Sequence, residues 1–319
     1  MKRKIAFSMI LAVSAFLTAC GSNNEEQAKN NDALTVYTTI YPLMYLAEEI
    51  GGNLIDVKSV YPANADEHSF EPSQKEIIDM AESDLFLYIG YNLEGFVKKA
   101  EPILEDEGVK VAAIGEQIDI DVDSHSEEDH DHAEEGHDDH EGHDHGDVDP
   151  HVWLDPNLMI QMAEQVKNEL TELLPEKESY FEENYQQTAE KMKDLDADFK
   201  QMVEESAKDE IIVSHAAYGY WEARYGIEQL AVAGLSSSSE PSQKQLTELL
   251  KTAKEHDIEY VLFEQNVPSK LTETIQKEIG AKSLTIHNLS VLTSEDMENG
   301  EDYISLMERN ISTLKEALQ

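Results

Sequence analysis

Histidines are the residues of this sequence whose types and spacing most clearly suggest chemistry. Seven of the twelve stand among fourteen acidic residues between Asp121 and Asp149. Imidazole nitrogen is the usual ligand of zinc and similar metals, whereas carboxylates alone favour magnesium or calcium. We interpret the tract as a collector of transition-metal ions, through His125, His130, His132, His137, His140, His143 and His145. The alternative is an acidic, low-complexity surface loop that only keeps the chain soluble.

His151 differs from the tract histidines because it stands in a rigid local sequence, Asp-Pro-His-Val-Trp-Leu-Asp-Pro, from Asp149 to Pro156. Pro150 restricts the backbone before it, and a Trp-Leu pair follows it. Packing can therefore fix the direction of its ring, and we expect His151 to bind a metal ion directly.

Two similar halves must position these residues. Apolar runs alternate with helical patterns, which predicts parallel sheets covered on both faces. The predicted strands run from Leu34 to Ile40, Asp56 to Val60, Asp84 to Ile89, Val109 to Ile114, Ile211 to Ser214, Glu228 to Ala233, Glu259 to Phe263 and Lys282 to Ile286. The sequence Glu-Pro-Ser-Gln-Lys at Glu71 recurs at Glu240, each time as a predicted helix N-cap, which supports a duplication.

A long helix from Ser179 to Ala207 is predicted between the halves, because apolar residues recur at threes and fours without proline or glycine. The predicted fold class is α/β, with two similar (βα)4-like lobes joined by a long rigid helix and a metal site in the cleft. The expected segments are a signal peptide (1–19), a flexible tether (20–32), an N-terminal lobe (33–174) with the His-rich acidic loop (121–147), a linking helix (175–207) and a C-terminal lobe (208–319).

Three histidines follow predicted strands, where ligands of open parallel sheets bind. His68 lies in the loop after the second strand, His151 closes the tract after the fourth, and His215 follows Ser214 directly. The first two belong to the N-terminal half and the third to the C-terminal half. An ion bound by all three would therefore sit in the cleft.

The N-terminus resembles a secretory signal. Lys2, Arg3 and Lys4 precede a short apolar run that ends at Leu-Thr-Ala before Cys20, the only cysteine. We expect a lipid on Cys20 to hold the chain on the outer face of the cell membrane. Loss of the three basic residues changes the net charge from −43 to −46, which disfavours nucleic acid as a partner and favours cations.

Together the lipobox, the Glu67-His68 loop, the histidine-rich insertion, the Asp149–Pro156 stretch and Ser214-His-Ala-Ala-Tyr-Gly-Tyr220 resemble the zinc-binding lipoproteins of bacterial ABC importers, the ZnuA/AdcA type. The resemblance implies Zn²⁺ held in the cleft by His68, His151 and His215. It also implies delivery of the ion to a membrane permease with a cytoplasmic ATPase, by a protein that is not an enzyme and that we expect to be monomeric.

The fourth ligand is where the sequence departs from that family. Many relatives carry a carboxylate after the last strand, and the matching position here is Ser290, a poor zinc ligand. We favour Glu67 or a water molecule instead. Glu264 is interpreted as an acceptor that orients a ligating histidine, or alternatively as an ordinary hydrogen-bonding group at a strand end.

Other functions were weighed against zinc transport. A manganese or iron carrier of the same family is the main alternative, although three imidazoles suit zinc better than manganese. A secreted zinc hydrolase is disfavoured because the sequence has no His-Glu-x-x-His motif. A role in cell adhesion rests only on analogy with some relatives.

Overall fold

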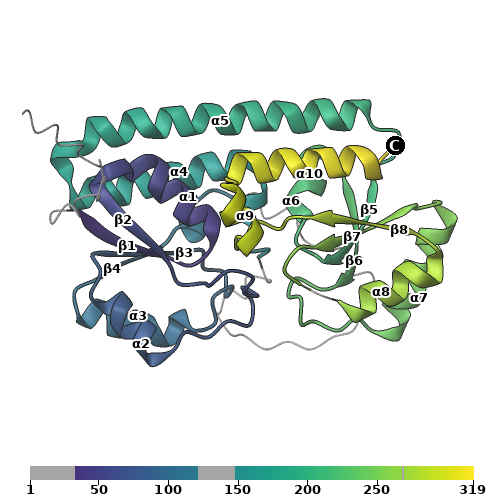
Figure 1. The fold of residues 1–319 in the computed structure, drawn as a ribbon, viewed down its shortest axis with the longest axis horizontal. Helices are drawn as coiled ribbons and strands as arrows, with labels where there is room; N and C mark the ends of the chain where they lie inside the picture. The colour runs from purple at the N-terminus through teal and green to yellow at the C-terminus, as the bar shows by residue number, and fades with distance from the viewer. Residues whose placement is uncertain (1–32, 121–147, 268) are drawn as a thin grey trace, which may run out of the picture. The chain divides into compact units, whose positions relative to one another are not determined.

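The structure is a computed structural model that describes residues 33–120, 148–267 and 269–319. Residues from Ala33 onward form one compact unit. In the N-terminal half, β1 (Leu34–Thr38), β2 (Ile55–Ser59), β3 (Leu85–Tyr88) and β4 (Lys110–Ala113) form a parallel sheet in the order β2-β1-β3-β4 (Figure 1). Its helices are α1 (Tyr41–Gly51), α2 (Gln74–Ala81) and α3 (Val97–Asp106), with short 3₁₀ turns η1 (Gly52–Leu54) and η2 (Gly115–Gln117).

The C-terminal half repeats this plan. Strands β5 (Glu210–His215), β6 (Glu228–Ala233), β7 (Tyr260–Glu264) and β8 (Lys282–Ile286) are parallel in the order β6-β5-β7-β8. The helices are α6 (Gly219–Tyr225), α7 (Gln243–Glu255), α8 (Lys270–Ile279), α9 (Ser294–Asn299) and α10 (Tyr303–Ala317). The two sheets have equivalent strand orders, so the predicted α/β class with two similar parallel sheets is confirmed.

The repeated Glu-Pro-Ser-Gln-Lys sequence has the same local structure in both halves. Ser73 caps α2 and Ser242 caps α7, each by accepting a hydrogen bond at 3.3 Å from the backbone N–H three residues later. Glu76 and Gln245 complete the capping boxes by accepting from the cap backbone. The duplicated sequence therefore begins an equivalent helix in each half.

Helix α5 (Glu178–Glu205) is the predicted long helix, and it contacts both halves. It follows α4 (Pro156–Leu173) and the turn η5 (Pro175–Lys177). Near its start, Asn184 donates to the Ile50 carbonyl at the end of α1 at 2.9 Å. At its end, Glu205 pairs with Lys315 of α10 at 2.7 Å. One continuous helix therefore packs against helices of both halves, α1 in the first and α10 in the second (Figure 1).

The segment from Asp149 to Asp155 is buried between the halves. It contains the 3₁₀ turn η4 (Val152–Leu154), whose three residues are fully buried. The Trp221 indole donates to the Leu154 carbonyl at 2.8 Å, and the Tyr303 hydroxyl donates to the Trp153 carbonyl at 2.6 Å. Hydrogen bonds from α6 and α10 thus fix the backbone around His151.

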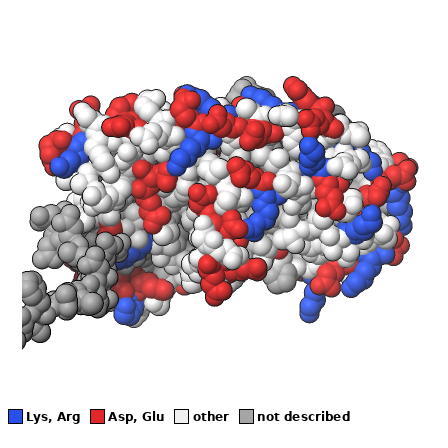
Figure 2. Space-filling view, turned by 45° about the horizontal axis from the view of Figure 1, so that its top comes forward, with Lys and Arg blue, Asp and Glu red and all other residues white. Residues whose placement is uncertain are grey.

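No helix within the described ranges is both long and apolar enough to cross a bilayer. The surface of the described part carries many charged side chains (Figure 2). On the face shown in Figure 2, Asp and Glu side chains spread over the surface with Lys and Arg side chains between them. Many are paired along helices, as Lys75 is with Asp79 at 2.7 Å. Exposed pairs of this kind contribute little to stability.

The two capping boxes give a matched stability test. Ser73→Ala and Ser242→Ala each remove a cap oxygen, and each should lower the free energy of unfolding by about 1 kcal/mol. Urea denaturation followed by circular dichroism measures both losses. Ser179→Ala is the control, because that exposed serine lies inside α5 rather than at its cap. A loss as large in the control would contradict the role of the caps.

Candidate metal centre

His68 and Glu67 lie in the loop that joins β2 to α2. The His68 backbone N–H donates to the Asp66 carboxylate at 3.0 Å, and the Tyr61 hydroxyl donates to the Glu67 carbonyl at 3.3 Å. Glu67 is only 1% exposed. The loop therefore presents one imidazole and one buried carboxylate side by side, with His68 Nε2 lying 4.0 Å from Glu67 Oε1.

His151 is fully buried, and its orientation is set by a residue two positions earlier. One oxygen of Asp149 accepts from the His151 backbone N–H at 2.9 Å and faces ring Nδ1 at 2.7 Å. The Trp153 ring packs against the imidazole, with the ring centroids 5.2 Å apart. Asp149 was not among the predicted site residues, although its place two residues before a histidine was the available signal.

His215 ends β5 and is oriented by a carboxylate at the end of the neighbouring strand β7. Glu264 Oε1 lies 2.6 Å from His215 Nδ1, and both side chains are almost fully buried. The two residues come from adjacent parallel strands, whose carboxyl ends share one edge of the sheet. The structure thus places Glu264 at the position expected for an acceptor that orients a histidine.

The three imidazoles converge through their Nε2 atoms. His151 Nε2 lies 3.3 Å from His68 Nε2 and 3.3 Å from His215 Nε2. Since carboxylates face Nδ1 of His151 and His215, the neutral rings carry their protons there, and the Nε2 lone pairs point at one another. A tetrahedral zinc ion with bonds of about 2.0–2.1 Å separates its nitrogen ligands by about 3.3 Å. The spacing therefore fits an ion between them.

Glu67 completes a four-residue cluster with these histidines. One ligand atom from each residue lies within 4.8 Å of all the others. Glu67 Oε2 is buried without a hydrogen-bond partner among the described residues. A buried carboxylate oxygen without a donor is costly, and a cation would satisfy it.

Protonation of the cluster is set mainly by burial. Burial, together with the neighbouring His151 and His215, lowers the pKa of His68 to about 3, so this ring is neutral at ordinary pH. Burial also opposes charge on His215, but the facing Glu264 carboxylate outweighs it and raises the His215 pKa. Burial raises the pKa of Glu67. His215 and Glu67 therefore hold protons more readily than usual, and a metal ion must displace them.

Ser290 lies outside the cluster, although sequence matching places it at the position of a family ligand. Its hydroxyl donates to Asn288 Oδ1 at 2.9 Å. Asn288, in turn, donates from Nδ2 to Glu67 Oε1 at 3.2 Å and to Glu264 Oε2 at 3.0 Å. Asn288 was not among the predicted site residues, and no local pattern indicates its contact with Glu67, because 221 positions separate the two.

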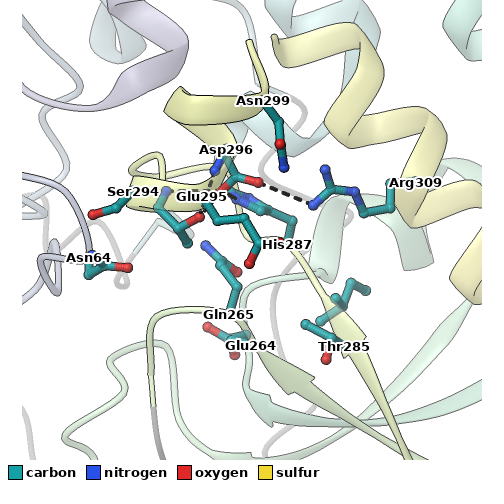
Figure 3. Close-up of a pocket in the computed structure, with 12 residues that line it drawn as sticks. Asn64, Glu264, Gln265, Thr285, His287, Ser294, Glu295, Asp296, Asn299 and Arg309 are labelled. Atoms are coloured by element: carbon teal, nitrogen blue, oxygen red, sulfur yellow. Dashed lines mark hydrogen bonds and ion pairs between the residues drawn. The ribbon is translucent and has the colours of Figure 1, made fainter. Parts of the chain in front are cut away.

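The two remaining described histidines have other partners. His256 is exposed and pairs with Glu210 at 2.6 Å. His287 is buried, with Nε2 lying 3.0 Å from Asp296. It lines a pocket of about 610 Å³, and Asp296 of the same pocket also pairs with Arg309 (Figure 3). Glu264 lines the same pocket. The tract histidines and Cys20 lie outside the described residues.

Known zinc-uptake proteins are similar to this chain. The family model ZnuA, described as "Zinc-uptake complex component A periplasmic", matches residues 36–317. The chain is 34% identical over 315 residues to "Zinc-binding lipoprotein AdcA" of Streptococcus pneumoniae, covering 98% of this chain and 61% of that relative. It is 33% identical over 313 residues to "High-affinity zinc uptake system protein ZnuA" of Bacillus subtilis, covering 97% of this chain and 96% of the relative.

A solved structure has the same fold. The Zn(II)-bound ZnuA-like domain of Streptococcus pneumoniae AdcA superposes with a TM-score of 0.72 at 30% identity, covering 90% of this chain and 99% of that domain. The chain thus spans less than two thirds of the length of AdcA while matching its ZnuA-like domain almost completely. The family model matches the chain from β1 to the end of α10, and this chain therefore belongs to the ZnuA family of zinc-uptake components.

Proposed function

We propose that this protein is the extracytoplasmic solute-binding component of a zinc ABC importer. It binds Zn²⁺ through His68, His151, His215 and Glu67 and delivers the ion to a membrane permease driven by an ATPase. The observation that carries the proposal is the cluster of four donor atoms within 4.8 Å, supplied by loops and strand ends of both halves. The names of its relatives, a zinc-binding lipoprotein and a zinc uptake protein, support zinc as the ion.

The donor set favours zinc over manganese or iron. Three neutral nitrogens and one oxygen suit a four-coordinate zinc ion, whereas manganese prefers more oxygen ligands and a higher coordination number. Competition between Zn²⁺ and Mn²⁺ for the purified protein separates these functions. Equal retention of manganese would favour the alternative carrier.

Burial of the cluster supports a carrier rather than a hydrolase. His151 and His215 are at most 1% exposed. A catalytic zinc ion needs an open coordination position and room for a substrate beside it. A carrier, by contrast, needs to enclose only the ion.

The place of action is proposed from the N-terminus. Cleavage before Cys20 and lipidation of that residue would anchor the chain to the outer face of the membrane, with residues 20–32 as a tether to the lobes at 33–174 and 208–319. Mass spectrometry of the cell-derived protein tests this directly. A mature form without a lipid mass on Cys20 would contradict the anchor.

Loss of one ligand should abolish tight binding. Replacing His151 or His215 with alanine should weaken zinc binding by more than about 100-fold, because loss of a residue that only orients a ligand already costs about 10–100-fold. Competition with a chromophoric chelator measures the Kd. His256→Ala is the matched control, since this histidine pairs with Glu210 and lies outside the cluster, and its Kd should stay within about threefold. A tight site in the His151 or His215 variant would contradict this ligand set.

Zinc affinity should fall as pH falls. The raised pKa of His215 means that a proton competes with the metal through the ordinary histidine range, and each displaced proton weakens affinity about tenfold per pH unit. His68, with its pKa lowered to about 3, should add no competition in this range. Calorimetry in buffers of different ionisation enthalpy counts the protons released. Undiminished affinity at about pH 5 would contradict the prediction.

For the His-rich tract we propose auxiliary capture of zinc. Deleting residues 124–145 should lower the total zinc stoichiometry, because it removes all seven tract histidines, and should leave one tight site. Equilibrium dialysis with metal analysis measures both. If the tight site vanished with the deletion, the tract would be part of the primary site.

A further inference from the structure

Asn288 is fully buried just after β8, and hydrogen bonds fix the orientation of its side-chain amide. Its Oδ1 accepts from Gln265 Nε2 at 3.0 Å, from the Ser290 backbone N–H at 3.2 Å and from the Ser290 hydroxyl at 2.9 Å. Three donors at the oxygen leave one orientation for the NH₂ group. The amide is therefore held before any metal ion binds.

The NH₂ group faces two carboxylates from opposite halves of the chain. It donates to Glu67 Oε1 at 3.2 Å and to Glu264 Oε2 at 3.0 Å. Both carboxylates are buried, at 1% and 6% exposure. Like charges so placed repel each other, and a neutral group with two hydrogens relieves the repulsion without binding the metal itself. Asn288 thus joins the proposed oxygen ligand to the carboxylate that orients His215.

We propose that Asn288 is the positioning residue that makes Glu67 a ligand of the metal ion. It holds Oε1 of Glu67 at the cluster, 4.0 Å from His68 Nε2, while Oε2 has no partner among the described residues. No lysine or arginine forms an ion pair with Glu67 within the described part of the chain, so the amide supplies its side-chain hydrogen bond. This inference rests on the proposed zinc-binding function.

The test is a double-mutant cycle between Asn288 and Glu67. Asn288→Leu keeps a similar volume and removes the donor. We expect it to weaken zinc binding by about 10–100-fold and to change the visible absorption of the Co²⁺-substituted protein, which reports coordination geometry. In the Glu67→Ala background the same substitution should weaken binding by no more than about threefold. An unchanged Kd and spectrum, or an equal loss in both backgrounds, would overturn the proposal.

A milder variant covers the possibility that Asn288→Leu does not fold. Gln265→Leu removes two hydrogen bonds to Asn288 and leaves Asn288 in place. It should shift the Co²⁺ spectrum in the same direction, and only when Glu67 is present. Gln161→Leu is the matched control, since Gln161 also forms two hydrogen bonds, both with the Asp119 backbone, and lies outside the cluster. Its spectrum should match that of the unmodified protein. A Gln265→Leu spectrum equal to the control would overturn the role of Asn288.

The unmodified protein and His215→Ala separate this inference from the proposed function. If the unmodified protein binds no zinc, or His215→Ala retains the tight site, the zinc-binding function fails. If both behave as expected and Asn288→Leu leaves the Kd and the spectrum unchanged, only the positioning role fails.

Discussion

The centre depends on two buried hydrogen bonds between imidazoles and carboxylates. Asp149 and Glu264 face Nδ1 of His151 and His215, at 2.7 and 2.6 Å, and so direct the Nε2 lone pairs into one small space. In water such pairs would be weak and mobile. Here burial strengthens the electrostatic interaction and packing removes alternative ring orientations. The Nε2 lone pairs therefore face one another with no positively charged side chain between them among the described residues. A metal cation can bind these lone pairs.

The duplicated fold explains how residues far apart in sequence reach this space. In each half the central strands end at the same edge of a parallel sheet, so the loops after them meet. His68 follows an edge strand of one sheet, whereas His215 and Glu264 end central strands of the other. Helix α5 contacts both halves and limits bending between them. The helix therefore links the scaffolds that carry the two sets of site residues.

Much of this arrangement could be predicted from the sequence. Apolar runs alternating with helical patterns predicted the eight described strands within a few residues of their bounds. A short apolar run such as β3, with Leu85, Phe86 and Leu87 fully buried, is typical of a strand in a sheet that is covered on both faces. Because ligands of open parallel sheets bind beyond the carboxyl ends of the strands, the sequence predicted that the three histidines lie together, as they do in the structure. The contacts of Asn288 could not be predicted, since they depend on side-chain rotamers and on a pairing across 221 positions. For the same reason the choice between Glu67 and water as fourth ligand stayed open.

The Asp149–Asp155 segment is held by residues of the C-terminal half. This segment follows the N-terminal sheet in sequence, yet its backbone carbonyls accept from Trp221 and Tyr303, and the Trp153 indole donates to the Asn288 carbonyl at 2.7 Å. The backbone around His151 is thus held by the C-terminal half, which also carries His215. His68 and Glu67 would be the ligands that separate from His151 and His215 if the proposed carrier opened between its halves. Such an opening would have to break the hydrogen bonds that Asn288 and Asn266 donate to the loop of Glu67.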